Sequence, residues 1–319
     1  MKYRVKHVVE YAVLRGVVAL VRRLPYRLAL FVGWSIAWPA HFVFRFRARE
    51  ARERIRGVFG DRYSRREVNH IAWLSWRNFV FTNIDLIRLP WVTLDWIQSR
   101  VEGRQAAKAI VEKHHATGKG AILATAHMGA WEVAAVAMQR FGMPIFILTG
   151  KQKNPLVDAY INRLRGGTGI RTIPRASNLL RDVIRQLRQG GYLAFLPDVR
   201  AKTESLRIRF LGKDANVPAG MAVFAHQADV PVIFAVITRV GWSHHRLVMF
   251  EPVYPDRHRT KQDDWQRVIQ EIFSRIETAI REQPEQWFWY NKRWILDPLE
   301  DRKSRVGDHP SDGDGQKTM

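Results

Sequence analysis

The segment AILATAHMGAWE, residues 121–132, carries the transition from strand to helix on which the fold of this chain depends. Its first half is apolar enough for a strand buried on both faces, and a stretch of small residues suited to a helix follows. Comparable apolar runs recur as PIFIL at 144–148, YLAFL at 192–196 and VPVIFAVI at 230–237. Strands that are apolar throughout are typical of parallel sheets. We therefore predict an α/β fold with a mainly parallel sheet flanked by helices.

The remaining sequence is expected to surround this sheet. Helical patterns are predicted at 131–141, 155–165, 177–189, 218–228 and 261–283, with a further strand at 246–250. Residues 50–118 indicate a helical cover, in which Ser64 and Glu67 form a capping box. The polar, mixed-charge stretch 300–319 is expected to be disordered. The predicted organisation is 1–50 as membrane-associated helices, 51–299 as the α/β domain with its cover, and 300–319 as a tail.

The composition excludes several classes of protein. The chain has 319 residues, 52 Lys and Arg against 30 Asp and Glu, a net charge of +22, and no Cys. A disulfide-stapled module, a Cys-ligated metal site and thiol catalysis are therefore excluded, and no metal or cofactor is predicted. The positive charge indicates an anionic partner: a nucleic acid, a membrane surface or a phosphorylated substrate. No helix-turn-helix, zinc finger or RNA-binding aromatic motif accompanies the charge, which argues against nucleic acid.

The charge is concentrated at the N-terminus, beside an apolar run. Residues 1–66 contain 16 Lys and Arg against 4 Asp and Glu, and they enclose the uncharged run LALFVGWSIAWPAHFVF at 28–44. A helix of that length reaches about 25 Å, against a hydrocarbon core of about 30 Å, so it could span the bilayer or enter it partway. The preceding residues 5–20 suit an amphipathic helix on anionic lipid. The alternative is a helix buried in the protein core with solvated Arg residues at its ends.

His127 follows the first apolar run, where the carboxyl end of a parallel strand presents reactive groups. With an ordinary pKa near 6.5, its neutral imidazole can accept a proton. Glu132 would lie about 140° away on a continuous helix, so the two meet only if a turn intervenes, and Gly129 permits one. Glu132 would then hydrogen-bond the ring and stabilise the imidazolium. The alternative is a structural histidine.

No GxSxG motif supplies a serine nucleophile, so the base is expected to act on a substrate hydroxyl, which indicates direct acyl transfer. Arg163, Arg165, Arg171 and Arg175 lie within one turn region after a helix and suit a phosphate cradle, and Arg163, Arg165 and Arg175 are predicted to bind substrate. Asp198 ends another buried strand, and PEQWFWYNKRW at 284–294 mixes aromatic residues with cations. Each feature has a structural alternative. The arginines could form a solvated face, Asp198 could cap a helix, and residues 284–294 could belong to an ordinary aromatic core.

In this order, the motifs HMGAWE, NPLVDAYINRLRGGTGIRTIPR, GYLAFLPD and PEQWFWYNKRW make residues 20–297 resemble the late acyltransferases of bacterial lipid A biosynthesis. These are the lauroyl and myristoyl transferases of the lysophospholipid acyltransferase superfamily. The resemblance implies transfer of an acyl chain from acyl carrier protein to a hydroxyl of a phosphorylated glycolipid, on the cytoplasmic side of the inner membrane. It assigns His127 as the base and Glu132 as its partner, and it places the family's Arg-rich and Asp motifs on Arg163, Arg165 and Asp198.

This sequence departs from the family pattern at two places. Arg200 stands where many relatives have a second acid, and HMGAWE differs inside the box from the more usual residues. The choice of acceptor therefore stays open between a lipid A precursor, a mannolipid and another membrane lipid with a free hydroxyl, including a lysophospholipid. A noncatalytic membrane-binding scaffold of the same fold is the competing class.

Overall fold

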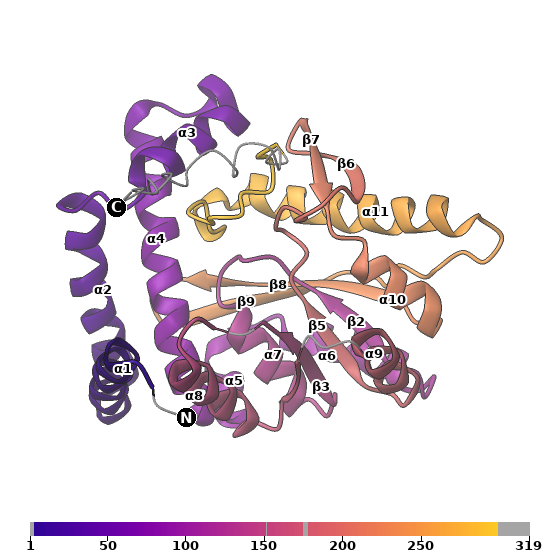
Figure 1. Ribbon diagram of the computed structural model, residues 1–319, viewed down its shortest axis with the longest axis horizontal. Helices are drawn as coiled ribbons and strands as arrows, with labels where there is room; N and C mark the ends of the chain where they lie inside the picture. Colours follow the sequence, from indigo (N-terminus) through magenta and orange to yellow (C-terminus); the bar gives the residue numbers. More distant parts are fainter. Residues whose placement is uncertain (1–2, 151, 175–177, 299–319) are drawn as a thin grey trace, which may run out of the picture.

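The strand predicted at 121–126 lies in the middle of the sheet, as β2 (Ala121–Ala124). The computed structural model describes residues 3–150, 152–174 and 178–298. Within these residues the main sheet has seven strands in the order β1-β9-β8-β2-β5-β3-β4 (Figure 1). Besides β2, the main sheet contains β1 (Val101–Glu102), β3 (Ile145–Thr149), β4 (Arg171–Pro174), β5 (Tyr192–Phe195), β8 (Val232–Val240) and β9 (His244–Met249). A separate hairpin consists of β6 (Leu206–Phe210) and β7 (Lys213–Val217).

The sheet is mainly parallel, as predicted. β2 pairs in parallel with β5 and β8, and β3 pairs in parallel with β4 and β5, whereas β8 and β9 are antiparallel. The register sets Ala124 of β2 opposite Phe195 of β5. The carboxyl ends of β2 and β5 are therefore neighbours, which is where the candidate site lies.

Helices cover both faces of the sheet (Figure 1). Alternate residues of each strand face opposite sides, so Ile122 belongs to one buried cluster and Leu123 to the other. The first cluster includes α9, α10, α11 and the β6–β7 hairpin, and the second includes α5, α6 and α7. The bounds are α5 (Leu94–Arg100), α6 (Arg104–His115), α7 (Trp131–Arg140), α8 (Pro155–Gly166), α9 (Leu179–Arg188), α10 (Gly220–Ala228) and α11 (Lys261–Glu282).

The predicted helical cover is present as α3 (Ala48–Phe59), α4 (Arg65–Arg88), α5 and α6, together with the 3₁₀ turns η1 (Gly60–Arg62) and η2 (Leu89–Trp91). The capping box that begins α4 is confirmed: Glu67 N–H donates to the Ser64 hydroxyl, and Ser64 N–H donates to the Glu67 carboxylate. α4 is the long helix that separates α2 from the rest of the molecule in Figure 1. Along it, Ala72 packs in the main core and Phe81 packs with the N-terminal helices.

The N-terminal segment forms α1 (Val5–Arg23) and α2 (Tyr26–Phe42). α2 is buried on one face only: Leu30 and Ala37 are buried, whereas Phe31 and Trp38 are about half exposed. A buried pair fixes the helix, because Tyr26 O–H donates to Asp85, which also pairs with Arg239 of β8. Among the described residues, no helix has both the length and the apolar character needed to cross a membrane.

Some elements were not predicted. The β6–β7 hairpin, the edge strand β4 and the two-residue β1 lack continuous apolar runs. In β6, buried and exposed residues alternate, so the pattern differs from the one that identified the central strands. The stretch 300–319, for which we predicted disorder, lies outside the described residues.

Candidate active site

The loop that leaves β2 is shaped by Gly129, which adopts a positive φ of 60°. A Cβ at this position would lie 2.0 Å from the carbonyl oxygen of Ile237, so only glycine fits. The next residue, Ala130, donates its N–H to the same carbonyl, and the Gly129 carbonyl accepts the hydroxyl of Thr82. The turn predicted between His127 and Ala130 is therefore present, and it is held from both sides.

The partner of His127 is Asp198, which follows β5. The Nδ1 atom of His127 lies 2.8 Å from Oδ1 of Asp198, and the backbone N–H of His127 donates to Oδ2 at 2.8 Å. A third donor, Nε1 of Trp287, also reaches Oδ2 at 2.8 Å. Three contacts thus fix a carboxylate whose side chain is 1% exposed, against 26% for His127. Because an ionised carboxylate only accepts, Nδ1 carries the proton and Nε2 is left as the basic nitrogen.

The electrostatics of this pair favour a charged imidazole. Burial opposes charging of His127, but the Asp198 carboxylate outweighs it and raises the pKa of the imidazole. Burial likewise opposes ionisation of Asp198, but His127, Trp287 and the backbone N–H lower the pKa of the carboxyl. The pair therefore stabilises the imidazolium that forms when His127 accepts a proton.

Glu132 has a different position from the one we predicted. Its carboxylate accepts two hydrogen bonds from Arg165 of α8, from Nη2 at 2.5 Å and from Nε at 3.3 Å. No hydrogen bond joins Glu132 to His127 in the described part of the chain, because the turn at Gly129 directs the imidazole to β5. The negative charge of Glu132 still contributes to raising the pKa of His127. The predicted role of orienting the ring is therefore filled by Asp198.

A cavity of about 350 Å³ opens at these residues. His127, Glu132 and Arg165 contribute its polar wall together with Arg293, and Trp131 lies edge-on to the imidazole with ring centroids 5.4 Å apart. The apolar wall comes from α7, β3 and β5, and includes Met138, Ile147, Leu148 and Phe195. The cavity thus combines a base, two cations and an apolar lining.

The other predicted binding residues are distributed unevenly. Arg165 lines the cavity, whereas Arg163, two positions earlier on α8, is exposed and is not among its lining residues. Asp198 is present at the site, where its oxygens accept from His127 and Trp287, and the predicted role of Asp198 in substrate binding stays a prediction. Arg175 lies outside the described residues.

The C-terminal segment, which begins with η3 (Pro284–Gln286), closes the site. Phe288 N–H donates to the His127 carbonyl, and Gly129 N–H donates to the Gln286 carbonyl, so this segment pairs with the loop after β2. It also brings Trp287 to Asp198 and Arg293 to the cavity. The sequence indicated this segment by its mixture of aromatic residues and cations, but it did not distinguish Trp287 from the other aromatic residues there.

The chain is similar in sequence to known acyltransferases. The chain is 22% identical over 196 residues to a phosphatidylinositol mannoside acyltransferase of Mycolicibacterium smegmatis, covering 60% of this chain and 62% of that protein. It is 23% identical over 231 residues to the protein of that name from Mycobacterium tuberculosis, covering 70% of this chain and 69% of the relative. The match therefore spans less than two thirds of the first of these relatives. The model of the family described as bacterial lipid A biosynthesis acyltransferase matches residues 2–295, so the chain belongs to this family of acyltransferases.

Proposed function

We propose that this chain is a membrane-associated O-acyltransferase that moves a fatty acyl chain from an acyl carrier protein thioester to a hydroxyl of a glycolipid. The observation that carries the proposal is the pairing of His127 Nδ1 with the buried Asp198, which leaves Nε2 as the base beside a cavity with an apolar wall. Family membership supports acyl transfer, and the absence of a GxSxG motif supports direct transfer without a serine intermediate.

In the proposed reaction, His127 Nε2 takes the proton of the acceptor hydroxyl as its oxygen bonds to the thioester carbonyl carbon. The carbon–sulfur bond of the tetrahedral intermediate then breaks, and the sulfur takes the proton from the imidazolium. The products are the ester and the free thiol of the carrier. Asp198 stabilises the imidazolium between the two proton transfers, because it already raises the pKa of His127.

We assign Arg165 a binding role in this scheme, together with Arg293. Both line the cavity, and Glu132 holds the guanidinium of Arg165 through two hydrogen bonds. A fixed cation at this place suits an acceptor phosphate or the oxyanion of the intermediate. This gives Glu132 a positioning role that acts through Arg165.

The acceptor is proposed as a glycolipid of one of two kinds. Family membership favours a phosphorylated lipid A precursor. The relatives named as phosphatidylinositol mannoside acyltransferases favour a mannosylated phospholipid as the second candidate. The two arginines at the cavity suit the phosphate of either candidate.

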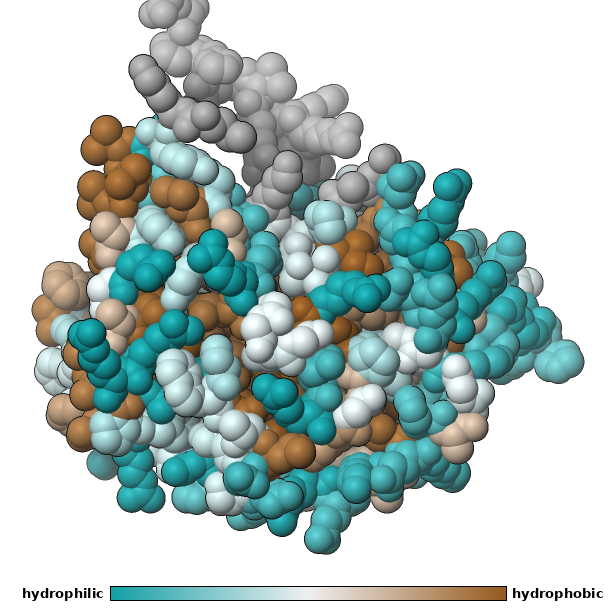
Figure 2. Space-filling view, turned by 90° about the horizontal axis from the view of Figure 1, so that it is seen from below, coloured by the Kyte–Doolittle hydropathy of each residue, from teal (hydrophilic) through white to brown (hydrophobic). Residues whose placement is uncertain are grey.

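Membrane association is proposed through the outer faces of α1 and α2. Exposed apolar residues gather there: Val5, Val8, Val9, Val13, Leu28, Phe31, Ile36, Trp38 and Phe42. Figure 2 shows apolar side chains along the edge of the molecule where α1 and α2 lie in Figure 1. Such a face, flanked by Arg residues, suits a helix pair that lies in the interface of the cytoplasmic leaflet of the inner membrane.

The test combines the purified protein with an acyl carrier protein thioester and either glycolipid. We expect an ester product by mass spectrometry and one free thiol for each ester formed. Thiol release without ester would indicate hydrolysis and contradict acyl transfer to the lipid. An equal rate with the corresponding coenzyme A thioester would contradict the assignment of acyl carrier protein as the donor.

A further inference from the structure

A second cavity, of about 660 Å³, lies where α2 ends and α3 and α4 begin. It shares no lining residue with the active-site cavity. Its charged lining residues are Arg45, Arg49, Arg52, Glu53, Arg56 and Arg65. We call this cavity the arginine pocket.

Most of this positive charge is not neutralised by the protein. Arg49 pairs with Glu53 at 2.8 Å. The side chains of Arg45, Arg52, Arg56 and Arg65 make no hydrogen bond or ion pair with any residue that the structure describes. Arg52 and Arg56 are four positions apart on α3, where like charges destabilise a helix unless an anion joins them. The pocket is therefore electrostatically complementary to a negative group.

The turn that carries Arg45 also exposes apolar side chains. In Phe44-Arg45-Phe46-Arg47 the two arginines have φ of 50° and 48°, a left-handed conformation that costs energy for a residue with a Cβ. Phe44 is 77% exposed and Phe46 is 49% exposed. These rings continue the exposed apolar face of α2 to the rim of the pocket, so cations and apolar groups are presented side by side.

The floor of the pocket is neutral. Burial, reinforced by the neighbouring Arg52, lowers the pKa of His41 to about 4. The Nδ1 of His41 is 3.0 Å from the hydroxyl of Tyr290, which donates to the Ala72 carbonyl. The positive charge of the pocket at neutral pH therefore comes from its arginines.

We propose that the arginine pocket binds the phosphate of an anionic membrane lipid, apart from the acceptor that is acylated. The arginines would hold the headgroup phosphate while the exposed rings of Phe44 and Phe46 enter the acyl region. Free phosphate would leave these rings in water, and an acidic protein surface would give no reason for an apolar rim. The inference rests on the proposed membrane association and adds a specific site to it.

The test measures binding to vesicles of phosphatidylcholine alone and of phosphatidylcholine with phosphatidic acid. We expect the wild-type protein to bind both and to prefer the anionic vesicles. Arg52→Gln/Arg56→Gln should reduce that preference by about 5-fold for each arginine and leave binding to pure phosphatidylcholine unchanged. Gln has a helix propensity close to that of Arg, so α3 should be retained.

A matched control removes two charges elsewhere. Arg181 lies on α9 and Arg259 just before α11, and both are exposed. In Figure 1, α9 and the end of α11 that is farther from α4 lie at the side of the molecule away from α2 and α3. Arg181→Gln/Arg259→Gln should keep the wild-type preference, because charges beyond a Debye length of about 10 Å are screened. An equal loss in both double variants would mean a general effect of net charge and overturn the site.

Three other outcomes separate the remaining explanations. Complete competition by inorganic phosphate at millimolar concentration would assign the pocket to a free anion. A loss of binding to acyl carrier protein with the lipid preference retained would assign it to that protein. If the wild-type chain binds neither kind of vesicle, the proposed membrane association is wrong, and the proposed lipid site is overturned with it.

Arg45→Gly gives an independent test, because a lower lipid preference in this variant could not be attributed to loss of the fold. Glycine adopts the left-handed conformation without strain, so the melting temperature should rise. The preference for phosphatidic acid should nevertheless fall. A variant that is more stable and retains the full preference would show that the strained arginine has no part in lipid binding.

Discussion

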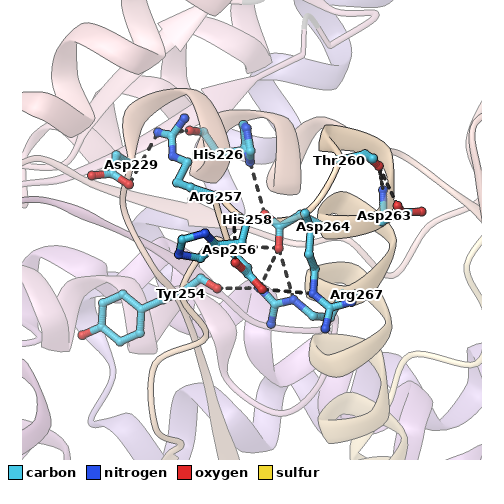
Figure 3. Close-up of polar contacts among 11 residues, drawn as sticks. His226, Asp229, Tyr254, Asp256, Arg257, His258, Thr260, Asp263, Asp264 and Arg267 are labelled. Carbon is cyan, nitrogen blue, oxygen red and sulfur yellow. Dashed lines mark hydrogen bonds and ion pairs between the residues drawn. The ribbon is translucent and has the colours of Figure 1, made fainter.

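Two histidine–aspartate pairs occur in this molecule, and they differ in what surrounds them. His127 meets Asp198 between two strand ends, with the histidine side chain 26% exposed and at a cavity. His226 of α10 meets Asp264 of α11 at 3.2 Å, with side chains 6% and 1% exposed (Figure 3). The same two residue types therefore occur once at an opening and once in a closed contact between helices.

The aspartates also have different partners. Asp264 accepts from Arg267 at 2.6 Å and 3.1 Å and from the backbone N–H of Asp256 at 3.1 Å, so a cation already neutralises it (Figure 3). Among the residues that the structure describes, Asp198 accepts from the His127 ring, the His127 backbone and Trp287, so its charge acts on the imidazole. A histidine–aspartate pair is therefore suited to proton transfer when the carboxylate is not neutralised by a cation and the imidazole lines a cavity.

The largest effect is expected from His127→Ala. Loss of the general base should lower turnover by about 10²- to 10⁴-fold, while the fold and vesicle binding are retained. Thioester-dependent formation of the lipid ester measures turnover, and circular dichroism checks the fold. Near-wild-type turnover by a folded His127→Ala protein would contradict the mechanism.

Asp198→Asn tests whether the carboxylate controls the base, and the loss in turnover should be about 10²-fold because charge and tautomer control are both removed. The pH dependence gives the second readout. Asp198 raises the pKa of His127, so activity of the wild type should fall on the acid side below a pKa above 6.5. Without Asp198, the largest opposition to the effect of burial is removed and Glu132 alone still raises the pKa, so this acid limb should move to lower pH. A limb that stays in place would assign it to another group.

The same pair makes stability depend on pH. The raised pKa of His127 gives stabilisation that is complete below its unfolded value near 6.5 and is lost as pH rises through the folded value. The lowered pKa of Asp198 gives stabilisation that is present above about 3.9 and is lost as pH falls through the folded value. Urea unfolding across pH gives the free energy of unfolding of the wild type and of Asp198→Asn. The wild type should show the two opposite slopes of this free energy against pH, and both should be absent in Asp198→Asn.

Glu132→Gln should have a smaller effect, about tenfold in turnover or about 1.4 kcal/mol, because it weakens a contact with Arg165. If Glu132 acts through Arg165, the double variant Glu132→Gln/Arg165→Gln should lose little more than Arg165→Gln alone. Arg163→Gln is the matched control, since Arg163 is exposed on the same helix and does not line the cavity. Additive losses would mean that Glu132 acts on the reacting groups directly.

The sequence predicts the parts of the site that depend on position along the chain, but not those that depend on how strands and helices are arranged in space. The apolar runs identified the central strands, and the position of His127 at a strand end was correct because strand ends can be located along the chain. The order of strands was not predictable from their composition, so the adjacency of β2 and β5 that joins His127 to Asp198 was missed. The contact between Glu132 and Arg165 required the orientation of α8, and the contact of Trp287 with Asp198 joins residues 89 positions apart.

The smallest effect on turnover is expected from a change in the pair of His226 and Asp264. His226→Ala removes one contact of Asp264, but Arg267 and the Asp256 N–H still bind that carboxylate, so the buried charge keeps its partners. We expect a loss of about 1–3 kcal/mol in the free energy of unfolding from the lost hydrogen bond and packing, measured by urea denaturation. Turnover per folded molecule should match that of the wild type, because α10 and α11 contribute no residue to the active-site cavity. A loss of turnover comparable to that of His127→Ala would mean that exposure and competing cations do not distinguish the two pairs.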